Sequence, residues 1–200
     1  MREQKVIKRY FLVIACLFFC SCVHRIEPPS LPKSLIFKPY PLTIVLYQSK
    51  TFRNYNHLLA TIANYRSTID LGTPSSIILL DTLKAMFDHV ISVDNIANTP
   101  NYYAGLLEPT IVGLRDLSMS TKIGTVEIIY SFILYNRNKQ EITRFEISGR
   151  DYSGSWFVTD ATGPAMQDAM AQLMVKFQDD PKIKAWLAEN GVNQKQENLK

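Results

Sequence analysis

Cysteine is absent from most of the chain. Only three of the 200 residues are cysteine, and the last of them is Cys22. Exported proteins often use disulfides for stability, but residues 23–200 cannot form one among themselves. Thiolate metal sites and cysteine nucleophiles are excluded from this part of the chain for the same reason. We therefore expect its stability to come from a hydrophobic core.

The sequence also lacks the usual signatures of catalysis. It contains no HExxH motif, no P-loop, no GxGxxG fingerprint and no GxSxG nucleophile elbow. The segment Gly149–Trp156 contains two serines but not the elbow spacing, which indicates a turn at a strand end. The three histidines, His24, His57 and His89, are widely spaced. Hydrolytic and metal chemistry usually needs clustered side chains, so we expect no enzyme, no metal and no cofactor.

No apolar run is long enough to span a membrane as a helix. The longest, Tyr10–Cys20, is far shorter than the roughly 20 residues that a spanning helix needs. It follows the basic residues Lys5, Lys8 and Arg9, and small residues come after it. A basic start, an apolar run and small residues before a cleavage point are typical of a secretory signal peptide.

The end of this run, Phe19-Cys20-Ser21-Cys22, resembles the signal of a bacterial lipoprotein. The resemblance implies diacylation of Cys22, cleavage before it, and attachment of the mature chain to a membrane through that residue. Val13-Ile14-Ala15-Cys16 fits the same pattern, but cleavage there would leave a very apolar new end. An ordinary cleaved secretory signal is the other alternative. We take residues 1–21 as the signal peptide and Cys22 as the lipidated residue.

Little net charge remains once the signal is removed. Residues 1–21 hold four basic residues and one acidic residue, so their removal lowers the net charge from +4 to +1. Nucleic-acid binding usually needs a clustered basic surface. We therefore expect no nucleic-acid partner.

Proline is concentrated just after the signal. The stretch His24–Pro41 holds five of the ten prolines, and proline favours extended, polyproline-like chain. We expect residues 22–41 to be a lipid-anchored tether, residues 42–192 a single periplasmic domain, and residues 193–200 a polar tail. Leu35–Phe37 is apolar for a tether, and we favour packing along the domain over docking on a partner.

The domain alternates between strand-like and helix-like patterns. Strands are expected at 42–47, 66–71, 91–93, 105–114, 125–136 and 141–149. Helices are expected after Thr73-Pro74, after Thr162-Gly163-Pro164 and after Asp180-Pro181, the last ending at Gly191. The segment Tyr55–Tyr65 fits either a helix or a strand. Pro109 suggests an edge or a bulge.

Together these elements predict an α+β fold. The four residues 137–140 join two strands in an antiparallel hairpin, which excludes a simple parallel doubly wound sheet. Apolar residues recur every three or four positions in the first two helices. They are Leu79, Leu83, Met86, Phe87 and Val90 in the first and Met166, Met170, Leu173, Met174 and Phe177 in the second. The first helix is therefore expected to include Asp88 and His89, with His89 near its terminal carbonyls, and to run directly into the strand at 91–93. We expect a two-layer sandwich, with a mixed, mostly antiparallel sheet of five or six strands and the two longer helices on one face.

Exposed aromatic residues offer the best candidate for a contact surface. Tyr102 and Tyr103 lie in the polar loop Asn95–Tyr103. Aromatic side chains in such loops often mark interaction surfaces. We expect this pair to contact a partner.

Three segments of the domain resemble a known group of proteins. They are Gly72–Val93, Gly105–Gly113 (GLLEPTIVG) and Ala165–Trp186. They are similar to small Gram-negative envelope lipoproteins related to the curli-secretion lipoprotein and to the amino-terminal domain of the Tol–Pal translocation protein. The resemblance implies a non-enzymatic periplasmic domain that works through protein contacts. Val23 directly after Cys22, in place of Asp, implies outer-membrane sorting by the rule of that group.

We therefore expect an outer-membrane lipoprotein that faces the periplasm. Its expected role is an accessory or structural component of an assembly, secretion or transport complex, with envelope proteins or further copies of itself as partners. The alternative is a periplasmic carrier lipoprotein that binds a lipid or small molecule in a cleft between its helices and its sheet.

Overall fold

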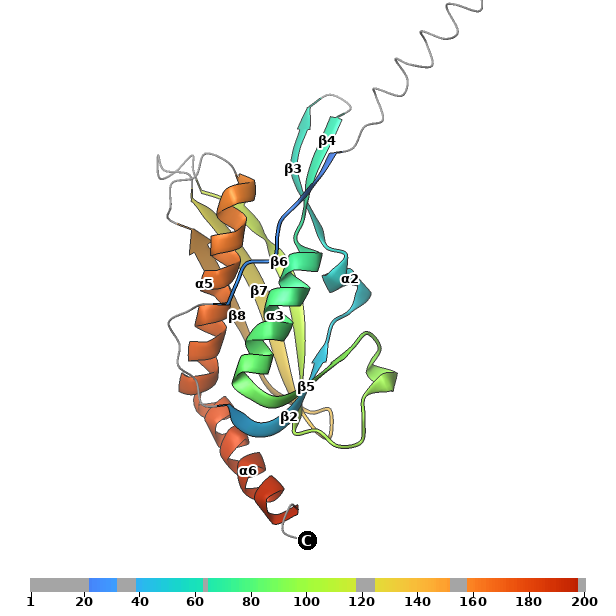
Figure 1. Ribbon diagram of the computed structural model, residues 1–200, viewed down its shortest axis with the longest axis vertical. Helices are drawn as coiled ribbons and strands as arrows, with labels where there is room; N and C mark the ends of the chain where they lie inside the picture. Colours follow the sequence, from blue (N-terminus) through green and yellow to red (C-terminus); the bar gives the residue numbers. More distant parts are fainter. Residues whose placement is uncertain (1–21, 32–38, 63–64, 118–124, 152–157, 198–200) are drawn as a thin grey trace, which may run out of the picture.

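The computed structural model describes residues 22–31, 39–62, 65–117, 125–151 and 158–197. They form an α+β fold in which a five-stranded mixed sheet is covered by helices, as predicted (Figure 1). Three predictions lie outside the described residues: the signal peptide 1–21, the packing of 35–37, and most of the turn at 149–156.

The main sheet has the strand order β5-β2-β6-β7-β8. Its strands are β5 (Phe87–Val93), β2 (Tyr40–Tyr47), β6 (Gly105–Asp116), β7 (Val126–Asn136) and β8 (Glu141–Asp151). The strand β2 pairs in parallel with both β5 and β6, whereas β6, β7 and β8 pair antiparallel. One half of the sheet is therefore parallel and the other half antiparallel.

The predicted hairpin between β7 and β8 is confirmed. Its loop is stabilised by Asn136, whose side-chain oxygen accepts hydrogen bonds from the backbone N–H groups of Asn138 and Gln140, both at 2.9 Å. Lys139 adopts a positive φ of 61°, the left-handed conformation that tight turns require. Because β7 pairs with β6 on one side and with β8 on the other, it is a central strand.

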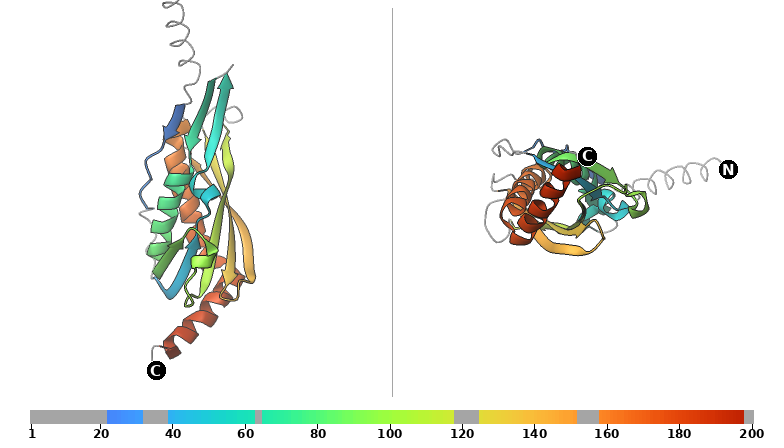
Figure 2. Two further views of the ribbon diagram at one scale, coloured as in Figure 1. Left: turned by 90° about the vertical axis from the view of Figure 1, so that its right-hand side faces the viewer. Right: turned by 90° about the horizontal axis from the view of Figure 1, so that it is seen from below.

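Two long helices lie on the same face of the main sheet (Figure 2). They are α3 (Gly72–Met86) and α5 (Val158–Asp179). The apolar stripe predicted for the second helix is buried throughout: Met166, Met170, Leu173, Met174 and Phe177. Phe177 packs edge-on against Phe87, with ring centroids 5.7 Å apart. The main core therefore lies between these helices and the sheet.

The last helix, α6 (Pro181–Glu197), is longer than predicted. Its start agrees with the prediction, because the Asp180 carboxylate accepts hydrogen bonds from the backbone N–H groups of Lys182 and Ile183. It continues through Gly191, where the sequence predicted its end. Residues 193–197 of the expected polar tail are therefore helical.

A second, three-stranded sheet was not predicted. It consists of β1 (Cys22–Arg25), β4 (Tyr65–Asp70) and β3 (Asn56–Ile62), in the order β1-β4-β3. The ambiguous segment 55–65 is thus mostly strand, because β3 pairs antiparallel with β4. Residues 22–25, expected at the start of a tether, instead form a strand parallel to β4. We call this three-stranded sheet the arm; it extends to the end of the molecule opposite α6 (Figures 1 and 2).

The helix starts also differ from the prediction. The first helix begins at Gly72, and the Asp70 carboxylate, not the Thr73 hydroxyl, accepts a hydrogen bond at this end, from the Thr73 N–H. The second begins at Val158, so the Thr162 hydroxyl does not cap it but donates to the Val158 carbonyl one turn earlier. Both segments contain a threonine followed by a proline, and this pattern predicts the start of a helix only approximately.

Pro109 fits the structure for a local reason. The strand β6 is central in the sheet, but its ladder with β2 covers only Gly105–Leu107. At Pro109 only β7 pairs with β6, opposite Phe132. A missing N–H is tolerated where one side of a strand has no partner. At Pro109 the strand β6 therefore behaves as an edge strand, as predicted. A bulge follows between Ile111 and Gly113.

Candidate partner-binding site at the edge of β5

The edge of the main sheet at β5 is the best candidate for a functional site. The helix α3 runs directly into β5, and this strand pairs with β2 on one of its two sides. No other strand of the described residues pairs with it. An edge strand presents backbone N–H and C=O groups that can pair with another chain. This edge can therefore accept a further strand.

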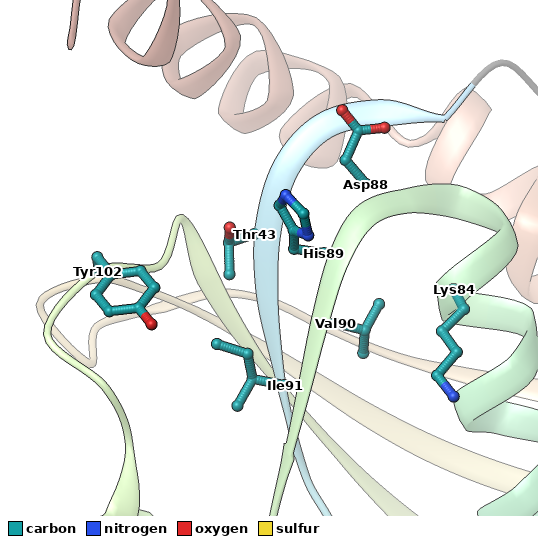
Figure 3. A pocket seen from close by; sticks show the side chains of 7 residues that line it. All are labelled: Thr43, Lys84, Asp88, His89, Val90, Ile91 and Tyr102. Carbon is teal, nitrogen blue, oxygen red and sulfur yellow. The ribbon is translucent and has the colours of Figure 1, made fainter. Parts of the chain in front are cut away.

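An open hollow of about 520 Å³ surrounds this edge (Figure 3). Its lining residues come from β2, from the end of α3, from β5 and from the loop before β6. They are Thr43, Lys84, Asp88, His89, Val90, Ile91 and Tyr102. Val90 packs against the main core, whereas Ile91 packs against a smaller cluster on the opposite face of the sheet. The hollow thus extends along both faces of the edge strand.

The structure separates the two tyrosines that the sequence grouped together. Tyr102 is 72% exposed and lines the hollow. Tyr103 is only 9% exposed; its hydroxyl donates to the Arg137 carbonyl at 3.3 Å, and its ring packs with Val45 and Leu106. Neighbouring side chains of an extended segment point in opposite directions. Of the predicted pair, only Tyr102 is available to a partner.

The loop that carries Tyr102 is ordered by a cap within it and by a backbone hydrogen bond to the sheet. It contains a short 3-10 helix, η1 (Ile96–Asn98), whose N-terminus is capped by the Asn95 side chain. At its other end, the Ala104 N–H donates to the Thr43 carbonyl at 2.8 Å. This bond holds the chain beside β2 directly after Tyr102. The aromatic ring is therefore presented at a defined place beside the β5 edge.

His89 and Asp88 belong to this site rather than to a helix. The sequence placed both residues on the first helix, with His89 near its terminal carbonyls. The helix ends at Met86, and both residues lie on β5, where they are exposed. With Lys84 they give the hollow one carboxylate, one amine and one imidazole. Such a lining suits a polypeptide with mixed polar and apolar side chains.

The opposite edge of the sheet is less suited to pairing. The outward positions of β8 carry the exposed charged residues Arg144, Glu146 and Arg150. Charged side chains on an edge strand oppose pairing with another chain. The corresponding surface of β5 carries His89 and Ile91. The strand β5 carries one exposed charged residue, Asp88, and β8 carries more, so β5 is the edge better suited to pairing with another chain.

One buried carboxylate and one buried pair of hydroxyls elsewhere are satisfied within the fold. The Glu127 carboxylate lies 2.7 Å from the Arg150 guanidinium and 3.6 Å from that of Arg115. The hydroxyls of Ser75 and Tyr130 share a hydrogen bond of 2.7 Å, and burial raises the pKa of Tyr130. Both residues of this hydroxyl pair are fully buried, so they cannot act on a solvent-borne substrate. These groups stabilise the fold.

The predicted lipidation residue lies at the far end of the molecule from α6. Cys22 is the first residue of β1, aligned with Ser67 of β4. In the described part of the chain, no helix is long and apolar enough to cross a membrane. Within the same residues, no three or more His, Cys, Asp or Glu side chains lie close enough together to hold a metal ion.

Comparisons with known proteins give weak similarities. No protein-family model matches the chain, and no curated protein does. Among solved structures, protein XCC0632 from Xanthomonas campestris, of family DUF330, has a TM-score of 0.47 at 7% identity and covers 90% of this chain and 100% of its own. Protein CT253 from Chlamydia trachomatis has a TM-score of 0.45 at 9% identity, over 68% of this chain and 95% of its own.

Lipoproteins occur among these similar structures. Lipoprotein GNA1162 from Neisseria meningitidis has a TM-score of 0.35 at 11% identity, over 70% of this chain and 96% of its own. Similarities of this strength do not assign the chain to a family. The names of these three proteins do not refer to curli secretion or to Tol–Pal, so the resemblance to that particular group stays a prediction.

Proposed function

We propose that the chain is a non-enzymatic lipoprotein of the bacterial envelope that binds a partner protein at the edge of β5. In this proposal Cys22 is acylated and holds the domain at the outer membrane, facing the periplasm. The protein serves as an accessory or structural component of an assembly, secretion or transport complex. The signal pattern supports the anchor, and the β5 edge supports the role in binding.

The main support for this proposal is that Tyr102 is exposed beside the edge strand β5. A partner segment in extended conformation would form main-chain hydrogen bonds with β5. Its alternate side chains would enter the hollow on the two faces of the strand, one of them beside Tyr102. Tyrosine is enriched at protein interfaces because it combines a large apolar ring with a hydroxyl. Main-chain pairing would supply affinity, and the two faces of the hollow would supply specificity.

The carrier alternative has less support. A carrier of this shape would hold its ligand between the helices and the main sheet. Large side chains of the described residues fill that space, including Phe132, Phe177, Leu83 and Met86, each fully buried. The hollow beside Tyr102 is open to solvent and has a mixed polar and apolar lining. An extended peptide fits these features better than an enclosed lipid does.

The test is capture of partner proteins by matched variants. Tagged full-length protein is extracted in mild detergent and purified, and the proteins that accompany it are quantified by mass spectrometry. Tyr102→Ala removes the exposed ring, whereas Val112→Ala removes a side chain that is 48% exposed on β6, away from the hollow. Neither change should alter the melting temperature, because both side chains are exposed.

We expect wild type and Val112→Ala to capture the same partner in stoichiometric amounts, and Tyr102→Ala to lose most of it. Equal capture by all three proteins would overturn the assignment of the site. Isolation of acylated wild-type protein alone, or with lipid only, would overturn the role in a complex and favour the carrier. A Cys22→Ala control shows whether capture needs the anchor.

A further inference from the structure

The ladder between β2 and β5 shows which backbone groups of β5 face the open edge. The Gln48 N–H donates to the Val93 carbonyl at 3.0 Å, so the backbone polar groups of Val93 point toward β2. In a strand the N–H and C=O of one residue point to the same side, and successive residues alternate. The backbone groups of Ile91 therefore also point toward β2. Those of Val90 and Ser92 point outward, where they can bond to another chain.

The carboxyl end of β5 is held in place by the side chain of Gln48, which is only 5% exposed. Its amide N–H donates to the Ser76 carbonyl of α3 at 3.0 Å, and its amide oxygen accepts a hydrogen bond from the Ser92 hydroxyl at 3.3 Å. The strand is thus joined to the helix beside its open edge. A strand that is ordered before its partner arrives loses less entropy on binding.

Two charged side chains of the hollow point in opposite directions along this edge. Figure 3 shows Lys84 pointing toward the carboxyl end of β5 and Asp88 pointing away from it. Both side chains are exposed, and Lys84 forms no ion pair with any other described residue. A chain that bonds to Val90 and Ser92 would therefore pass the Lys84 amine rather than the Asp88 carboxylate.

We infer that the partner of the β5 edge is an extended, acidic segment of another protein. It hydrogen-bonds to the main chain of Val90 and Ser92 and places a carboxylate against Lys84. On the other face of the sheet, its alternate side chains are apolar and contact Ile91 and Tyr102. This inference rests on the proposed function, because it assigns the partner of the same site. Main-chain pairing supplies affinity, and the charge of Lys84 selects among segments.

Peptides of defined sequence test both parts of the inference. Two short, end-blocked and fluorescein-labelled peptides, one alternating valine and glutamate and the other valine and lysine, are titrated with the full mature protein in mild detergent. Val90→Pro removes the outward N–H, whereas Val90→Thr keeps it. Lys84→Glu reverses the charge in the hollow, and Lys182→Glu makes the same change at an exposed position of α6. Proline is tolerated where the missing N–H faces solvent, so all variants should fold, which melting curves check.

We expect the wild-type protein to bind the glutamate peptide more tightly than the lysine peptide. Lys84→Glu should reverse this preference, and Lys182→Glu should retain it. Val90→Pro should weaken binding about tenfold, since it removes a hydrogen-bond donor and adds a ring at the edge, whereas Val90→Thr should not. A wild-type protein that binds neither peptide, or both equally, would overturn the acidic partner. Equal binding by Val90→Pro and Val90→Thr would overturn main-chain pairing.

Hydrogen exchange resolved to single amides locates the contact. In the protein without peptide, the amide of Ile91 should exchange slowly and those of Val90 and Ser92 rapidly. The glutamate peptide should slow exchange at Val90 and Ser92. Slow exchange at these two residues without peptide, increasing with protein concentration, would overturn the inference, because a second copy would then occupy the edge.

Failure of this inference is distinguishable from failure of the proposed function. Partner capture that depends on Tyr102, without peptide-dependent protection of Val90 and Ser92, would refute the acidic strand and leave the binding site in place. Peptide binding as expected, with no partner captured from the membrane, would refute the role in a complex and leave the strand-accepting edge in place.

Discussion

Replacement of Tyr130 by Phe should destabilise the fold by removing one partner of a buried hydrogen bond. The hydroxyls of Tyr130 and Ser75 are 2.7 Å apart and join β7 to the first turn of α3. Both residues are fully buried. A buried polar group that loses its partner costs about 1–3 kcal/mol. We expect Tyr130→Phe to lower the free energy of unfolding by about that amount.

The double variant Ser75→Ala/Tyr130→Phe separates this effect from general loss of packing. Removal of both hydroxyls leaves no unpaired group, so its loss should be smaller than the sum of the two single losses. The four proteins are compared by urea unfolding, in the Cys22→Ala background without residues 1–21. Additive losses would refute the argument, because they would mean that the hydroxyls do not interact.

The same pair predicts a dependence on pH. Burial raises the pKa of Tyr130, whereas an unfolded tyrosine titrates near pH 10. The folded state thus favours the neutral phenol, so the contribution to stability is complete below pH 10 and decreases above it as the unfolded state ionises. The decrease approaches about 1.4 kcal/mol per pH unit. The stability difference between wild type and Tyr130→Phe should shrink from pH 9 to 11; a constant difference would contradict the assignment.

Two further predictions concern packing. Gly149→Ala should lower the free energy of unfolding by about 1–3 kcal/mol or more, because a Cβ there would overlap backbone atoms of α5 at Ala165 and Ala169. Urea unfolding measures this loss, with Ser148→Ala as the control. Equal unfolding midpoints for the two variants would contradict the close approach of Gly149 to α5. Trp186→Phe should lower the free energy of unfolding by about 1–3 kcal/mol, because the indole N–H donates to the buried Ala104 carbonyl at 3.2 Å and that carbonyl would lose its partner. An unchanged unfolding midpoint would show that this bond contributes nothing.

Local patterns predicted the parts of the fold that depend on local sequence. The β7–β8 hairpin follows from two strand-like runs with a four-residue turn between them, and Asn136 stabilises that turn from within it. The apolar stripe of α5 follows from helical periodicity, and its five predicted residues are all buried. Asp180 caps α6 as its position before Pro181 suggests. In each case the stabilising contacts lie close in the chain or follow its periodicity.

Long-range pairing explains what the sequence could not predict. Residues 22–25 have no distinctive strand pattern, and they form β1 because β4, more than 40 residues later, offers an edge. The choice between helix and strand in 55–65 depends on the same sheet. The candidate site was predicted only in part. Tyr102 was found through its loop, but its separation from Tyr103 depends on the small cluster around Val45, which only the assembled sheet defines.

The β5 edge was not predicted from sequence at all. The direct connection from α3 to β5 was expected. The order of parallel strands in a sheet, however, cannot be predicted from a single sequence, because parallel neighbours need not follow each other along the chain. The placement of β2 between β5 and β6 makes β5 an edge. It also brings Thr43 and Tyr102, distant in sequence, to the same hollow.

The most direct test of the account is a mass spectrum of the amino-terminal peptide of the mature protein, isolated from membranes. We expect the mature chain to begin at Cys22 and this cysteine to carry a diacylglyceryl group, with the Cys22→Ala protein uncleaved and unmodified. A mature chain with a free Cys22 thiol, or one that begins at another residue, would contradict the lipoprotein assignment and, with it, the proposed localisation at the outer membrane.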